Sequence, residues 1–202
     1  MEDIVKPLSI LFYSLEPLIE KTLTLLIQLP PFLSEKKGFS PLQGMIRHLD
    51  KRFRYSLEVR HSSWFNNNLY DLLKENNISL VWSVRDKLIS PSIITSDQVY
   101  IRFIGDRNIS EKDFGTTVKD RRKEMLEYVK KVKDAQIVNS TIQDVLIAFN
   151  NHFAGFGPQS VNDFLKLMNM SEIDWKSELD NYENNSAQPN DRFQSSLSDF
   201  SK

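Results

Sequence analysis

The sequence predicts an α/β protein in which about five parallel strands alternate with helices. Short β-branched or leucine-rich runs of strand length recur along the chain, and segments with a helical apolar stripe lie between them. Within residues 98–104, Val99, Ile101 and Phe103 alternate with the neighbouring side chains, as expected for a strand. Strands that alternate with helices imply parallel β/α units joined by right-handed crossovers.

The expected strands are bounded by Pro, Gly or polar residues. They cover residues 22–28, 55–60, 78–84, 98–104 and 144–150. The helical stripes predict helices at 4–21, 41–52, 68–76, 118–134 and 158–168. Pro17 predicts a break in the first helix, and Pro41 is expected at the first position of the second, where its missing N–H is harmless.

The chain is expected to form one ordered domain with a polar tail. Residues 1–175 contain all the predicted strands and helices. Residues 176–202 are rich in Asn, Ser, Asp and Gln and contain few large apolar residues. Such a composition buries too little apolar surface to offset the entropy of ordering, so this segment is predicted to be disordered.

Composition indicates a cytoplasmic protein with no membrane segment. Of the 202 residues 40% are hydrophobic and 26% are charged, and the formal net charge is -1. A balanced charge gives no global attraction to nucleic acid or to an anionic membrane. The absence of Cys excludes disulfides and thiolate metal sites. No apolar run reaches the roughly 18 residues that span a bilayer, and MEDIVKP lacks the features of a secretory signal.

Polar side chains gather at one end of the predicted strands. With Leu57 and Val59 facing the helices, Glu58 and Arg60 point to the opposite side. The same alternation places further polar groups near the same ends of other strands: Gln28, Arg102 and Asn150. Two interpretations stay open. One is a buried structural ion network, and the other is a ligand site in which guanidinium forks bind phosphate or carboxylate.

The loops after two of the strands carry further candidates. His61 is a candidate catalytic residue, the alternative being a hydrogen-bonded structural histidine. Trp64 is either a stacking platform for a ligand or a lid over the core. Asp106 and Arg107 lie nearest the tip of the fourth strand and are expected to contribute to ligand binding.

The loop after the fifth strand is also a candidate site. Asn150 and Asn151 are candidate ligand-binding residues, and His152 is a candidate catalytic acid or base. Gly155 and Gly157 permit a close approach of the backbone, and the N–H groups of the helix that follows favour anions. The alternative is a helix-entry turn that requires only its glycines.

The sequence indicates a metal site only weakly. Glu58, His61, Asp106 and His152 are metal-ligand types, but they come from different strand ends and show no short spacing such as HExxH. The chain has no Ser–His–Asp signature, no phosphate-binding glycine loop and no dinucleotide fingerprint. The cofactor, if the protein uses one, is unknown from the sequence.

Four ordered segments resemble one known family. They are LLIQLPPFL, YSLEVRHSSWF, VYIRFIGDR and IAFNNHFAGFGP. Together they closely resemble the domain of unknown function 72 family, also called YecE-like. The segment FIGDRNISEKDFG followed by KDRRKEM is similar to the archaeal branch. The resemblance implies a TIM-barrel-like fold, here a partial (β/α) barrel, and no established activity.

The chain departs from that family before the first strand. Members usually carry three more β/α units there, and the sequence lacks them. A partial barrel would leave two strand edges unpaired. We therefore expect either a truncated chain, or missing strands supplied by self-association or by a second chain.

Three functions are compatible with these residues. The first is an enzyme for a phosphorylated or carboxylated substrate, with Arg60 and Arg102 as anion clamps and Glu58, His61 or His152 as acid or base. The second is a non-catalytic module that binds a ligand or nucleic acid. The third is a truncated remnant with no activity of its own. The expected partner is an anionic small molecule, and nucleic acid is kept as an alternative partner.

Overall fold

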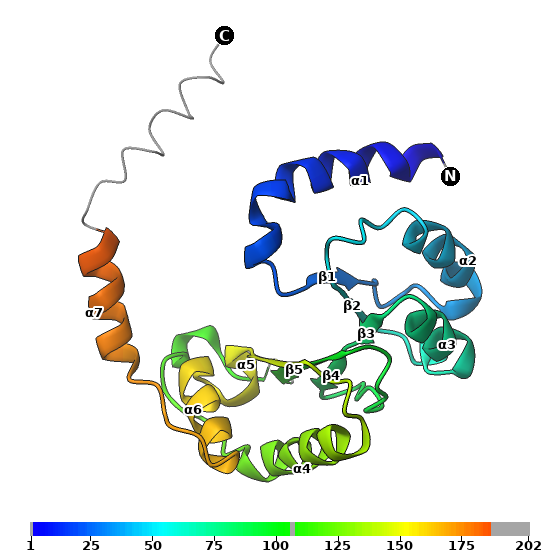
Figure 1. Cartoon of the computed structure of the whole chain (residues 1–202). Helices are drawn as coiled ribbons and strands as arrows, with labels where there is room; N and C mark the ends of the chain where they lie inside the picture. Colours follow the sequence, from blue (N-terminus) through cyan, green and yellow to red (C-terminus); the bar gives the residue numbers. More distant parts are fainter. Residues whose placement is uncertain (1, 106–107, 187–202) are drawn as a thin grey trace.

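The chain is described by a computed structural model over residues 2–105 and 108–186 (Figure 1). Within these residues all strand pairs are parallel, in two three-stranded sheets with the orders β1-β2-β3 and β4-β5-β6. The α/β class with parallel strands is therefore confirmed. The strands are β1 (Leu25–Gln28), β2 (Tyr55–Glu58), β3 (Ile78–Leu80), β4 (Trp82–Arg85), β5 (Gln98–Gly105) and β6 (Asp144–Phe149).

The strand expected at 78–84 is divided in two, so the described chain has six strands rather than five. The Thr95 hydroxyl donates to the carbonyl oxygen of Ile78 (2.7 Å) and accepts from the Leu80 N–H (2.8 Å). This side chain thus satisfies backbone groups that a neighbouring strand would otherwise pair. Consequently β3 pairs with β2, whereas β4 pairs with β5.

The helices cover the apolar faces of the two sheets, except for the last one, whose described side chains are exposed. They are α1 (Glu2–Leu15), η1 (Glu16–Lys21), α2 (Glu35–Ile46), η2 (Ser62–Trp64), α3 (Asn67–Glu75), η3 (Glu111–Asp113), α4 (Arg122–Val138), α5 (Asn151–Ala154), α6 (Gly157–Leu167) and α7 (Trp175–Ser186). The break expected at Pro17 is present, since the chain changes there from α-helix to the 3₁₀ segment η1.

The predicted start of the second helix is wrong. Helix α2 begins at Glu35 after the extended residue Ser34, so Pro41 lies inside the helix instead of opening it. An internal proline removes one backbone hydrogen bond, and this helix tolerates that loss. At the other end of the chain, α7 forms a helix where the disordered tail was expected to start. Residues 187–202 of that predicted tail lie outside the described part.

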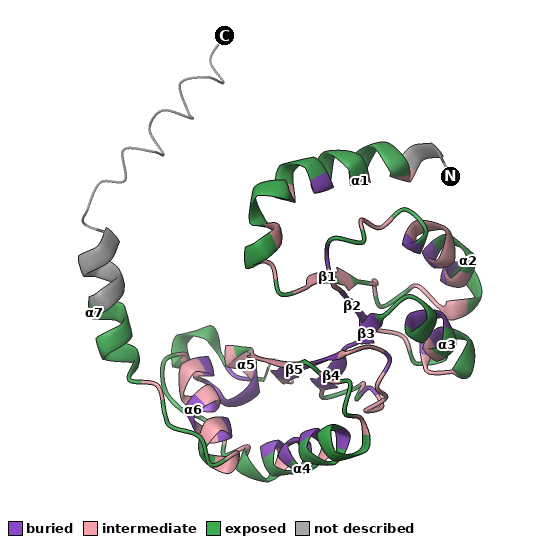
Figure 2. Ribbon diagram, in the orientation of Figure 1, coloured by how far each residue is buried: buried purple, intermediate pink, exposed green. Residues whose placement is uncertain are grey.

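Two hydrophobic clusters hold the chain together, one on each sheet. The first packs β1, β2 and β3 against α1, α2 and α3, and the second packs β4, β5 and β6 against α4, α5 and α6 (Figure 2). At the centre of the second cluster, Phe103 stacks on Phe149 (4.6 Å between ring centroids) and meets the edge of Tyr128 (5.2 Å). Burial of such side chains supplies most of the favourable folding free energy.

The opposite faces of the sheets are polar and curve toward each other. Arg102 of β5 donates a hydrogen bond to Gln28 of β1, although these strands belong to different sheets. At the amino-terminal ends of the strands, Arg54 pairs with both Asp97 and Asp144. Contacts between such distant strands require a strongly curved arrangement, so the polar side chains line a concave face.

Candidate functional site

Glu58, the last residue of β2, receives hydrogen bonds from three arginines. Its side chain is completely buried. Its Oε1 accepts from Arg60 Nε (3.1 Å) and from Arg85 Nη2 (2.6 Å), and its Oε2 accepts from Arg102 Nη1. Residues at or just beyond the carboxyl ends of β2 and β4, together with Arg102 of β5, therefore converge on one carboxylate.

Two neutral side chains complete the group. Gln28 Oε1 accepts from Arg60 Nη2 and from Arg102 Nη1, the latter at 3.3 Å. Ser83 Oγ accepts from Arg85 Nε at 3.2 Å. We call the set of Gln28, Glu58, Arg60, Ser83, Arg85 and Arg102 the Arg cluster.

Strand register explains why these side chains meet. Gln28 lies opposite Glu58 in the β1–β2 pair, and Ser83 lies opposite Arg102 in the β4–β5 pair. Neighbouring strands are about 4.8 Å apart, and residues in register point to the same side of a sheet. The apolar residues between them, such as Leu57, face the helices and are buried. The alternating sequence pattern thus builds the cluster.

The Arg cluster carries an excess of positive charge. One carboxylate faces three guanidinium groups, whose side chains remain 23–25% exposed. Burial lowers the pKa of Arg85, and the nearby charges of Arg60 and Arg102 act in the same direction, while Glu58 opposes them. Arginine stays protonated even so, and an anion would relieve the repulsion among the three groups.

Arg85 was not among the residues expected at the site, although the strand pattern contains the signal for it. Trp82 and Val84 are buried on the helix side, and Ser83 and Arg85 alternate with them. Ending the expected strand at Val84 left Arg85 outside the pattern. The expected neighbours Gln28, Glu58, Arg60 and Arg102 do come together in the structure.

His61 and Trp64 have local structural contacts. His61 Nδ1 lies 2.8 Å from Ser63 Oγ and accepts from the Ser63 N–H at 3.2 Å, so it caps η2. Trp64 is completely buried, and its indole N–H donates to the Leu33 carbonyl oxygen at 2.8 Å. This position corresponds to the lid over the core, since the fully buried ring offers no exposed face to a ligand.

The loop after β6 is held by its own polar residues. Asn150 Oδ1 accepts from the His152 N–H (2.9 Å), and Asn151 Oδ1 accepts from the Gly157 N–H (2.8 Å). These contacts fit the alternative of a helix-entry turn, and one N–H at the start of α6 is already satisfied. The His152 ring meets the edge of Phe114 at 4.9 Å, and its Nδ1 has no partner among the described residues.

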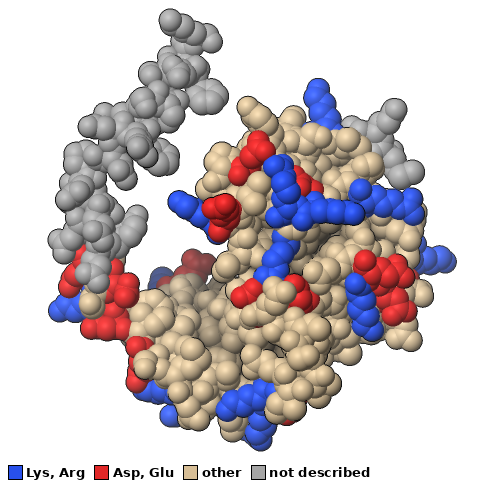
Figure 3. All heavy atoms as spheres, viewed as in Figure 1, with Lys and Arg blue, Asp and Glu red and all other residues tan. Residues whose placement is uncertain are grey.

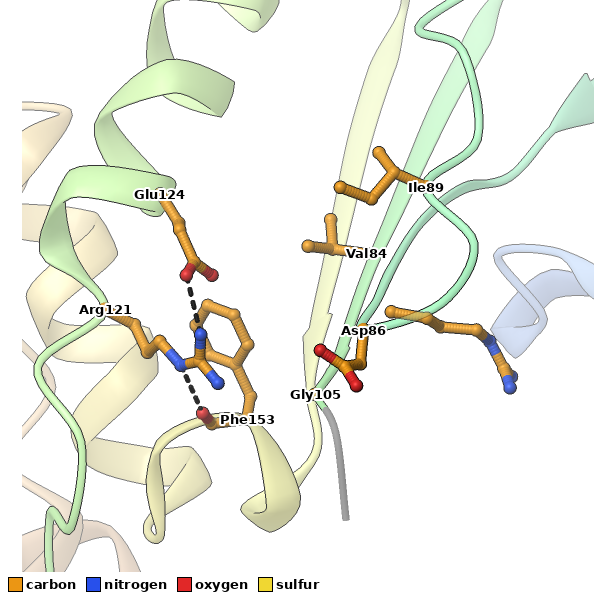
Figure 4. A pocket seen from close by; sticks show the side chains of 8 residues that line it. Val84, Asp86, Ile89, Gly105, Arg121, Glu124 and Phe153 are labelled. Carbon is orange, nitrogen blue, oxygen red and sulfur yellow. Dashed lines mark hydrogen bonds and ion pairs between the residues drawn. The ribbon is translucent and has the colours of Figure 1, made fainter. Parts of the chain in front are cut away.

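A cavity of about 150 Å³ lies beside the Arg cluster (Figure 4). Arg121 spans one wall, where its Nε donates to the Phe153 carbonyl oxygen (3.0 Å) and its Nη1 pairs with Glu124 (2.6 Å). Asp86 faces them across the cavity, and Arg85 contributes to the lining. The guanidinium of Arg85 is bound to Glu58, so Asp86 and Glu124 face Arg121 here, and this cavity favours anions less than the Arg cluster does.

The expected residues Asp106 and Arg107 lie outside the described part of the chain. The strand that leads to them ends at Gly105, where φ is +79°. In residues 2–105 and 108–186 no three His, Asp or Glu side chains gather as a metal site would require. Over the same ranges, no helix combines the length and the hydropathy needed to cross a bilayer.

Charged residues are unevenly distributed on the face shown in Figure 3. Lys and Arg side chains form a group across its middle, with Asp and Glu beside them. Together, the fold and the Arg cluster define an α/β protein with an electropositive group at the carboxyl ends of parallel strands.

The chain belongs to the DUF72 family, whose model is described as a protein of unknown function and matches residues 2–183. A crystal structure of a DUF72 family protein from Enterococcus faecalis has a TM-score of 0.67 and 22% identity, and the match covers 84% of this chain and 67% of that one. One from Thermotoga maritima has a TM-score of 0.63 and 22% identity, with 81% and 64% covered. No curated protein matches. The likeness to these structures establishes the fold.

Proposed function

We propose that the chain binds an anionic small molecule, a phosphate or a carboxylate, at the Arg cluster. The convergence of Arg60, Arg85 and Arg102 on one buried carboxylate carries this proposal. The Arg cluster has two more cations than anions, and a bound anion would offset this excess of positive charge. Guanidinium forks bind oxyanions in a fixed geometry, which makes such an excess useful in a ligand site.

The fold supports a ligand site at the carboxyl ends of the strands. The curved parallel strands resemble part of the wall of a TIM-like barrel, in which ligands bind at the carboxyl ends of strands. In the described part, β1 and β6 are the outer strands of their sheets. Further strands, from this chain, a second copy or another protein, would extend the wall around the concave face.

Glu58 is better suited to positioning than to acid–base catalysis. Both of its carboxylate oxygens already accept hydrogen bonds from guanidinium groups. His61 Nδ1 is likewise engaged by Ser63. If the protein is an enzyme, His152 is the group to test first, since its Nδ1 has no partner among the described residues and it follows the carboxyl end of β6.

Sulfate binding, measured by titration calorimetry, tests the proposal. Arg85→Met should weaken sulfate binding at least tenfold, because the loss of one charge-assisted hydrogen bond removes about 1.5–3 kcal/mol. Arg122→Met is the matched control: Arg122 pairs with Asp120 on the surface and its side chain is 66% exposed. It should leave the affinity unchanged.

Both variants should first be shown to fold by their thermal transitions. Sulfate should also raise the melting temperature of the wild-type protein, because a ligand that binds only the folded state stabilises it. Equal sulfate affinity in the wild-type protein and in Arg85→Met, or no binding to either, would contradict the proposed function.

A further inference from the structure

The Arg cluster has a charge of +2. Glu58 contributes one negative charge and the three arginines contribute three positive charges. Its other members, Gln28 and Ser83, are neutral. Among the described residues no second carboxylate pairs with these arginines, so within that part of the chain two positive charges have no counterion.

Several guanidinium nitrogens also have no acceptor in the described part of the chain. Arg60 uses Nε and Nη2, Arg85 uses Nε and Nη2, and Arg102 uses Nη1. The nitrogens left over are Nη1 of Arg60, Nη1 of Arg85, and Nε and Nη2 of Arg102. Each guanidinium has five N–H donors in a fixed fork, so every arginine keeps donors for a ligand.

The three arginine side chains are held in place and remain partly exposed. Each arginine is tied at one side of its guanidinium to the buried Glu58, which limits its motion. About a quarter of each side chain stays exposed, so a solute can reach it. Donors that are fixed before binding lose less entropy when a ligand arrives.

We propose that the ligand of this site carries a terminal phosphate group bound as its dianion. This inference rests on the proposed function and narrows it. A dianion matches the +2 charge, and a terminal phosphate has three equivalent oxygens, one for each guanidinium. A carboxylate and an internal phosphodiester each carry one negative charge, so either would leave one of the two positive charges of the Arg cluster without a counterion.

The chemistry is shared by inorganic phosphate and by phosphate monoesters, and calorimetry distinguishes the two. We would titrate the protein at pH 7.5 with inorganic phosphate, glycerol 3-phosphate, dimethyl phosphate and acetate, and with a short oligonucleotide lacking a terminal phosphate. Glycerol 3-phosphate or inorganic phosphate should bind at least tenfold more tightly than dimethyl phosphate or acetate. Tighter binding of the ester would identify a monoester site, and tighter binding of the free ion a phosphate site.

Ligand protonation gives a second, independent readout. A phosphate monoester has its second pKa near 6, so at pH 5 only about a tenth of it is dianionic. Its affinity should therefore fall about tenfold between pH 7.5 and pH 5. Sulfate remains a dianion throughout, and its affinity should stay constant, which controls for titration of the protein.

The outcomes separate this inference from the proposed function. If dimethyl phosphate, acetate or the oligonucleotide binds as tightly as the terminal phosphates and still depends on Arg85, the site binds anions but the dianion inference is wrong. If the affinity for glycerol 3-phosphate does not change with pH, the inference is also wrong. If sulfate does not bind, or binds equally well to Arg85→Met, the proposed function itself fails.

Discussion

Replacing Glu58 with Gln is expected to lower the free energy of unfolding by about 3–5 kcal/mol, the range seen when one partner of a buried ion network is removed. Glu58 is completely buried and neutralises part of the charge of Arg60, Arg85 and Arg102. Glutamine has nearly the same shape but no charge, and its amide N–H₂ group donates where the guanidinium groups also donate. The three arginines would then repel one another without a counterion. Urea denaturation measures the change.

Glu124→Gln provides the matched control. Glu124 pairs with Arg121 three residues earlier, and its side chain is 44% exposed. Exposed ion pairs contribute at most about 1 kcal/mol, so this variant should remain close to the wild-type protein. A loss for Glu58→Gln as small as that for Glu124→Gln would mean that the Arg cluster is not held together by the buried carboxylate.

Gly105→Ala is expected to cost about 3 kcal/mol or more, because it combines a strained backbone with a clash. Gly105 ends β5 with φ +79°, a conformation that L side chains rarely adopt. A Cβ there would lie 2.2 Å from the carbonyl oxygen of His152 and 2.7 Å from the Cα of Phe153. These are backbone atoms, so the loop after β6 would have to move away from the end of β5.

Gly115→Ala separates the cost of the backbone conformation from the cost of the steric clash. Gly115 has φ +99°, but a Cβ there would meet nothing within 4 Å. Only the conformational cost applies, which is about 1 kcal/mol. Chemical denaturation of the two variants should therefore differ by at least about 2 kcal/mol. Equal losses would show that the β5 end and the β6 loop are not in close contact.

The strands were predictable because one alternating pattern specifies both burial and pairing. Leu57 and Val59 face the helices, so Glu58 had to face the other side, and its neighbours in register followed from the same rule. That reasoning placed four members of the Arg cluster. It stopped one residue short at Arg85, because the last residue of a strand has no apolar neighbour beyond it to mark the alternation.

The features that the sequence did not predict depend on specific side-chain hydrogen bonds. Thr95 divides the third strand by bonding to Ile78 and Leu80, and nothing in the apolar pattern marks this contact. The loop histidine His61 looks catalytic in sequence, but its Nδ1 is used by Ser63 two residues away. Local capping and catalysis require the same residue types, so only geometry separates them.

The central claim is that the Arg cluster binds an oxyanion, and anomalous diffraction from crystals containing selenate tests it most directly. Selenate is a tetrahedral dianion whose selenium can be located without ambiguity. We predict a selenium peak within hydrogen-bonding reach of the guanidinium groups of Arg60, Arg85 and Arg102, and its loss in Arg85→Met. Selenate bound only at surface residues such as Arg122, with no peak beside the cluster, would contradict the account.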